Sequence, residues 1–90
     1  MDFQELLHIM EKLRSENGCP WDKVQTRESL KPYIIEEAYE LVEAIEANDP
    51  GNIKEELGDL LFQIVFQCQV AKEKDEFTMS DVIGGIGTKM

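Results

Sequence analysis

The sequence has 90 residues, 42% of them hydrophobic, which suits one small domain with a core that burial alone stabilises only marginally. Its 19 acidic and 9 basic residues give a formal net charge of -10, which repels nucleic acid backbones and anionic membrane surfaces. Cys19 and Cys68 show no CxxC spacing and no secretory leader precedes them. We therefore expect a single domain over residues 1–90, cytoplasmic with reduced thiols, that binds neither nucleic acid nor membranes.

The first predicted helix covers residues 2–14, where apolar residues recur at helical spacing and Asp2 and Glu5 lie favourably near the N-terminus. Gly18 and Pro20 then break regular structure and leave a loop of about a dozen residues, a length that usually has a function. A second helix is predicted from Leu30 to about residue 47. Pro32 is compatible with it because a proline is tolerated in the first turn of a helix.

The stretch "NDPG" ends the second helix, and Asn52 with Glu55 forms an N-cap signal for a third helix over about residues 53–74. A fourth segment follows, capped by Thr78 or Ser80 with Asp81. Its three glycines make its helicity dependent on tertiary support. Without any strand pattern, the sequence predicts an all-α helical bundle of four-helix type whose fourth helix is weak or truncated.

The second and third helices each carry an apolar stripe that we expect to form the core. The stripes are Ile34, Ile35, Ala38, Leu41, Val42 and Ile45 in the second helix, and Ile53, Leu57, Leu60, Leu61, Ile64 and Cys68 in the third. Phe62 and Phe66 fall outside the third helix's stripe, so that helix must be covered on a second side. We expect a second copy of the chain to cover it and to complete the bundle, although the first or fourth helix is an alternative.

Acidic residues at a spacing of three border both stripes. Glu37 and Glu40 lie on one flank of the second helix, and Glu56 and Asp59 on one flank of the third, continued by Gln63 and Gln67. Because the short link makes the helices antiparallel neighbours, the two pairs should converge. Four facing carboxylates repel unless they are protonated or bridged by a cation, and all-oxygen sites suit Mg²⁺ or Mn²⁺. The alternative is an ordinary solvated acidic face.

Three stretches together, "NGCPWDKVQT", "EEAYE" and "EELGDLLFQIVF", are similar to the MazG family of nucleoside triphosphate pyrophosphohydrolases. The family pattern E-E-x-x-E followed by E-x-x-D is matched by Glu36, Glu37, Glu40, Glu56 and Asp59. The resemblance implies an all-α fold, a homodimer or homotetramer, and Mg²⁺-dependent hydrolysis of NTPs to NMP and pyrophosphate, with Mn²⁺ as a substitute.

Roles for individual residues follow from the same resemblance. Glu37, Glu40, Glu56 and Asp59 are expected to ligate the metal, with Glu36, Glu37 and Glu40 as the catalytic set. Glu36 and Glu55 are expected beside the nucleotide or the attacking water, and Lys89 at the phosphates. Trp21 and Tyr33 are candidates to stack on the nucleotide. For Trp21 the alternative is a residue that holds the long loop against the bundle, and a similar packing role is open for Tyr33.

Family members continue beyond Met90 with a basic, histidine-containing stretch, so we expect a domain cut short at its C-terminal end. A second functional hypothesis follows: a non-catalytic helical dimer that binds metal, nucleotide or a regulatory partner protein. The leading hypothesis remains an enzyme that cleanses the nucleotide pool.

Overall fold

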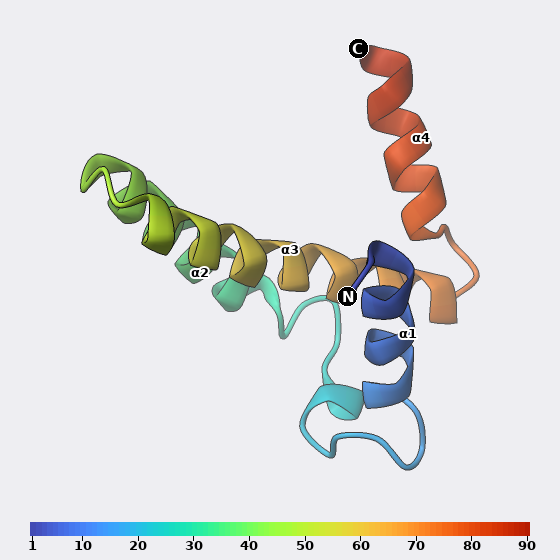
Figure 1. Cartoon of the computed structure of the whole chain (residues 1–90). Coiled ribbons are helices and arrows are strands. Elements are labelled where there is room, and N and C mark those ends of the chain that lie inside the picture. Colours follow the sequence, from blue (N-terminus) through green and yellow to red (C-terminus); the bar gives the residue numbers. More distant parts are fainter. The chain divides into compact units, whose positions relative to one another are not determined.

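A computed structural model describes all 90 residues, and every regular element is helical, as predicted. The elements are α1 (Phe3–Leu13), the short 3-10 helix η1 (Asp22–Val24), α2 (Lys31–Glu46), α3 (Pro50–Glu73) and α4 (Met79–Lys89) (Figure 1). None of the helices combines the length and the apolar content of a membrane span. The chain divides into two compact units, Met1–Gln25 with Val65–Met90, and Thr26–Ile64, and α3 contributes to both.

Side-chain caps start both α1 and α4, and the cap of α4 was predicted from the sequence. The Asp2 carboxylate accepts a hydrogen bond from the Glu5 backbone N–H at 2.8 Å. At α4, Thr78 rather than Ser80 is the N-cap, and Asp81 completes a capping box with it. No residue of α4 is fully buried, so the capping box contributes to fixing the start of the glycine-rich helix.

The predicted start of the third helix, with Asn52 as its N-cap, is wrong. Helix α3 begins at Pro50, and the Asp49 carboxylate accepts a hydrogen bond from the Asn52 backbone N–H at 3.2 Å. Proline suits the first helical position because its φ is already helical and no N–H is needed there. The Asp-Pro pair therefore starts the helix before the Asn-Glu signal is reached.

The connection between α2 and α3 is short because α2 ends in a Schellman motif. Asn48 adopts a left-handed conformation, with φ of 53°. Its N–H donates to the Ile45 carbonyl at 3.0 Å, and the Asp49 N–H donates to the Ala44 carbonyl at 3.3 Å. This turn makes α2 and the first half of α3 antiparallel neighbours within the Thr26–Ile64 unit, as predicted (Figure 1).

The unit formed by Met1–Gln25 and Val65–Met90 has an apolar core, and the Arg14 side chain lies over one of its rings. Its buried apolar residues are Met10, Val65, Phe66, Cys68, Val70 and Ala71. The Arg14 guanidinium lies 5.5 Å from the centre of the Phe66 ring, and its Nη1 donates to the carbonyls of Asp22 and Gln25 at 2.8 and 2.7 Å. The Trp21 ring packs edge-on against Phe66, with 6.4 Å between the ring centres. Arg14 and Phe66 thus hold the loop before α2 within this unit.

These contacts correct the expected assignment of the apolar faces. Phe66 is fully buried within the chain, where Arg14 at the end of α1 and Trp21 of the loop contact it, so no second copy is needed to cover this ring. Half of the twelve residues in the expected core stripes are instead exposed. Exposed fractions are 60% for Ile35, 51% for Val42, 52% for Ile45, 51% for Leu57, 37% for Leu61 and 42% for Ile64. The other stripe residues of the hairpin are half-buried, namely Ile34, Ala38, Leu41, Ile53 and Leu60.

Candidate functional site

The centre of the α2–α3 hairpin holds four carboxylates. Glu37 and Glu40 of α2 and Glu56 and Asp59 of α3 each offer one oxygen, and these oxygens all lie within 4.8 Å of one another. Three of the side chains are half-buried and Asp59 is exposed. The hairpin therefore gathers the four residues that the sequence singled out as candidate ligands.

The cluster lies in the seam between the two helices. Glu40 shares a hydrogen bond with Glu56, and the charge of Asp59 acts on Glu37, so each carboxylate of α2 interacts with one of α3. Residues that line such a seam recur at alternating spacings of about three and four. Leucine is usual in the seam of a helical hairpin, whereas carboxylates occupy the centre here. The sequence prediction had placed them at the border of the apolar stripes.

Crowding perturbs the acidity of the cluster. Burial, the hydrogen bond with Glu40 and the charges of Glu40, Asp59 and Glu37 raise the pKa of Glu56 to about 7. Burial and the neighbouring carboxylates Glu40, Asp59 and Glu36 also raise the pKa of Glu37 above its ordinary value. Without a cation, the cluster lowers its repulsion by holding a proton near neutral pH.

The donor set fits a hard divalent cation. Oε2 of Glu37 and Oε2 of Glu56 are buried without a hydrogen-bond partner. Buried carboxylate oxygens are normally hydrogen-bonded, paired or bound to metal, because desolvation is otherwise uncompensated. Oxygen donors of this kind suit Mg²⁺ or Mn²⁺. A cation would both satisfy these oxygens and remove the repulsion.

The other residues predicted for the site divide between the two units. Glu36 and Glu55 are exposed neighbours of candidate ligands on α2 and α3, and Tyr33, 38% exposed, lies one turn before Glu37. Trp21 and Lys89 belong to the other unit. Trp21 is 46% exposed and contacts Phe66, a contact expected of the loop-holding alternative. Lys89 is exposed at the last position of α4.

Sequence reasoning gave no role to Gln63, the most buried polar residue of the hairpin seam. It is 8% exposed, and its Oε1 has no hydrogen-bond partner. The signal that could have found it is its spacing, since it follows Asp59 by one helical turn on the flank of the cluster.

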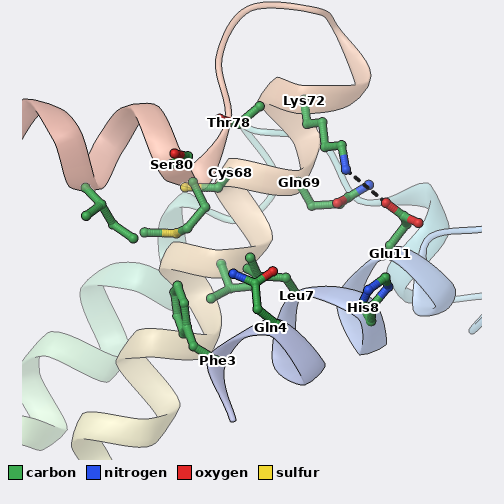
Figure 2. A pocket seen from close by; sticks show the side chains of 13 residues that line it. Phe3, Gln4, Leu7, His8, Glu11, Cys68, Gln69, Lys72, Thr78 and Ser80 are labelled. Carbon is green, nitrogen blue, oxygen red and sulfur yellow. Dashed lines mark hydrogen bonds and ion pairs between the residues drawn. The ribbon is translucent and has the colours of Figure 1, made fainter.

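A separate cavity of about 290 Å³ lies in the other unit, between α1, the end of α3 and the start of α4 (Figure 2). Cys68 lines it, and an ion pair of 3.0 Å between Lys72 Nζ and Glu11 Oε2 lies at its edge. None of the residues predicted for the site lines this cavity. The cluster and the cavity are therefore distinct features.

Comparison with known proteins identifies the domain. A family model described as the MazG nucleotide pyrophosphohydrolase domain matches residues 25–90. Over 88 residues and 98% of this chain, the sequence is 57% identical to the "nucleoside triphosphate pyrophosphohydrolase/pyrophosphatase MazG" of Thermotoga maritima, covering 34% of that protein. It is 49% identical over 94% of the chain to the Escherichia coli K12 "nucleoside triphosphate pyrophosphohydrolase", covering 33% of it.

A third relative, the uncharacterised protein YabN of Bacillus subtilis, is 49% identical over 99% of the chain, which covers 18% of that protein. The chain thus spans about a third or less of the length of these curated relatives. The family match extends from the end of the loop through the whole α2–α3 hairpin that carries the cluster. The chain belongs to the MazG nucleotide pyrophosphohydrolase domain family.

Proposed function

We propose that this chain is a Mg²⁺-dependent nucleoside triphosphate pyrophosphohydrolase that converts an NTP or dNTP and water to the monophosphate and pyrophosphate. The observation that carries the proposal is the cluster of four carboxylates within 4.8 Å, two of which have a buried oxygen without a partner. The names of the relatives from Thermotoga maritima and Escherichia coli support the same reaction class.

Glu37, Glu40, Glu56 and Asp59 hold the ion in this proposal, with Mn²⁺ as a substitute for Mg²⁺. When bound, the ion neutralises charge on the phosphate oxygens and lowers the pKa of water. Glu36 and Glu55, exposed beside the ligands, orient the nucleotide and the water. The water oxygen bonds to the α-phosphorus, the bond from that phosphorus to the oxygen bridging to the β-phosphate breaks, and a carboxylate accepts the water proton.

The strongly acidic chain also makes the ion necessary for binding. With a formal net charge of -10, the protein repels a triphosphate unless a cation lies between them. We further propose that the reaction serves to cleanse the cytoplasmic nucleotide pool. Lys89 is proposed to contact the phosphates, and Trp21 and Tyr33 the nucleoside.

A second copy of the chain is proposed to cover the exposed apolar stripes of α2 and α3. Six large aliphatic side chains of the hairpin are at least 37% exposed. Exposed apolar side chains in this number favour an interaction site, and closed symmetric pairs are the commonest arrangement of protein subunits. We therefore expect a homodimer or homotetramer, which light scattering after size-exclusion chromatography will distinguish from a monomer.

The experiment that tests the enzyme assignment incubates the chain with Mg²⁺ and each NTP and dNTP, and separates the products. Release of pyrophosphate with an equal amount of monophosphate is expected, because cleavage lies between the α- and β-phosphates. Glu40→Gln should abolish release while the chain stays folded. The matched control is Glu43→Gln, an exposed residue of the same helix outside the cluster, which should retain activity.

The outcome that contradicts the proposal is no pyrophosphate from any nucleotide by a folded wild-type chain with Mg²⁺ or Mn²⁺. That result would favour a non-catalytic helical dimer. Release of inorganic phosphate and a diphosphate would instead place the cleavage at a different bond.

A further inference from the structure

Gln63 is an unusual residue to find in the seam of a helical hairpin. Its side chain is 92% buried, given an exposed fraction of 8%, and its carbonyl oxygen has no hydrogen-bond partner. Buried polar atoms in folded proteins are almost always satisfied, because leaving one unpaired costs free energy. A leucine of similar size would avoid that cost. A bound ligand that donates a hydrogen bond to Gln63 Oε1 would remove this cost.

The register of the hairpin places Gln63 next to the carboxylate cluster. The four carboxylates converge within 4.8 Å of one another, and Glu37 and Asp59 are the two that lie farther along their helices from the connection. The next layer lies four residues farther from the connection in each helix. It consists of Tyr33, which precedes Glu37 in α2, and Gln63, which follows Asp59 in α3. This layer adds an aromatic ring and an amide to one end of the cluster.

The opposite end of the cluster offers nothing comparable. Four residues from the cluster toward the connection, α2 carries Ala44, which is 1% exposed and whose methyl group cannot form a hydrogen bond, and α3 carries Asn52, which is exposed. The hairpin connection follows directly after Ala44. A molecule that extends out of the cluster along the seam therefore finds an aromatic ring and a buried, unpaired amide oxygen only on the side of Tyr33 and Gln63.

A nucleoside triphosphate has two chemically different ends, and the seam has a matching division. Carboxylates with a divalent cation suit the triphosphate, whereas nucleosides are recognised by aromatic stacking and by hydrogen bonds to the sugar or base. We propose that Tyr33 and Gln63 form the nucleoside subsite, in which Gln63 Oε1 accepts a hydrogen bond from an N–H or O–H of the nucleoside. This inference rests on the proposed function, and it assigns the direction in which the nucleotide lies along the hairpin.

Gln63→Leu, made in the full 90-residue chain, tests the subsite. The KM and dissociation constant for the preferred NTP should rise roughly tenfold, the weight of one hydrogen bond. Affinity for Mn²⁺ and for inorganic tripolyphosphate, which lacks a nucleoside, should not change. The melting temperature should stay the same or rise, since an unsatisfied buried atom has been removed. A merely structural glutamine would lower it.

The matched control is Gln69→Leu, the same substitution on α3 at an amide that already donates to Glu73 Oε2 at 3.1 Å. It should leave all of these constants unchanged. Gln63→Met provides a second unbranched apolar replacement should the leucine variant fold poorly.

The outcomes separate the two proposals. A wild-type chain that neither binds nor hydrolyses any NTP overturns the proposed function and the subsite with it. A wild-type chain that binds NTP, with Gln63→Leu binding it equally well, overturns the subsite alone. Loss of Mn²⁺ and tripolyphosphate affinity in Gln63→Leu also overturns the subsite, because Gln63 would then act on the cation.

Discussion

Replacing Arg14 by leucine should release the loop that joins α1 to α2. The Arg14 side chain is 8% exposed, and it joins three parts of the Met1–Gln25 and Val65–Met90 unit. Nη1 donates to the carbonyls of Asp22 and Gln25, and Nε and Nη2 donate to the two carboxylate oxygens of Glu73 at 2.9 and 2.6 Å. The guanidinium also stacks over Phe66.

The magnitude follows from these contacts. Two hydrogen bonds from a charged donor to backbone carbonyls contribute about 1.5 kcal/mol each at the lower end of the usual range. The ion pair with Glu73 is partly exposed, with 37% exposure on the glutamate side, so it adds roughly 0.5 to 1 kcal/mol. The contact with Phe66 adds roughly 0.5 kcal/mol, which the apolar leucine largely replaces. Arg14→Leu should therefore lower the free energy of unfolding by about 4 kcal/mol.

Urea unfolding followed by circular dichroism measures this loss, at one fixed protein concentration because association affects stability. Trp21, the single tryptophan, reports on the loop by fluorescence. Arg14→Lys keeps the charge but cannot form the forked contact, so it should recover less than half of the loss. A loss below about 1 kcal/mol in Arg14→Leu, with unchanged tryptophan emission, would refute the reasoning.

Three further predictions follow from single features of the structure. The metal-free chain should melt at a lower temperature as the pH rises from about 5 to 8. The pKa of Glu56, raised to about 7, and the raised pKa of Glu37 give stability below the ordinary carboxyl pKa that is lost on deprotonation; scanning calorimetry should show a smaller slope in Glu56→Gln, and an unchanged slope would contradict this. Cys68 should react with a thiol reagent more slowly than Cys19, because Cys68 is buried and burial raises its pKa, and equal rates in the folded chain would contradict this. Asn48→Ala should destabilise the chain by about 1 kcal/mol and Asn48→Gly should not, because residue 48 has a φ of 53°; chemical denaturation that ranks the two variants equally would count against the Schellman turn.

The sequence was sufficient for the helices and for the acidic residues of the hairpin, because both depend on local spacing. Glu37, Glu40, Glu56 and Asp59 recur at helical intervals on either side of a short turn, so their convergence required no knowledge of distant contacts. The Asp-Pro pair that starts α3 is also a local signal. The Asn-Glu pattern three residues later is an equally valid N-cap signal, so the sequence alone did not decide between them.

The sequence was not sufficient for deciding which face of each helix is covered. Helices α2 and α3 are apolar on more than one side, and only the register of the hairpin shows that the polar seam faces inward while Ile35 and Leu57 stay exposed. The burial of Phe66 depends on Trp21 and Arg14, which are distant in the sequence. Contacts of that kind leave no periodic trace in the chain.

Calorimetric titration of the metal-free chain with Mn²⁺ and Mg²⁺ near pH 6.5 tests the central claim most directly, namely that the carboxylates of the hairpin seam share a divalent cation. The account predicts saturable binding accompanied by proton release, seen as a dependence of the heat on the buffer, because the cation displaces the proton shared with Glu56. Glu56→Gln should lose this binding and Glu43→Gln should keep it. Absence of saturable binding in the wild-type chain, or equal binding by Glu56→Gln, would contradict the account.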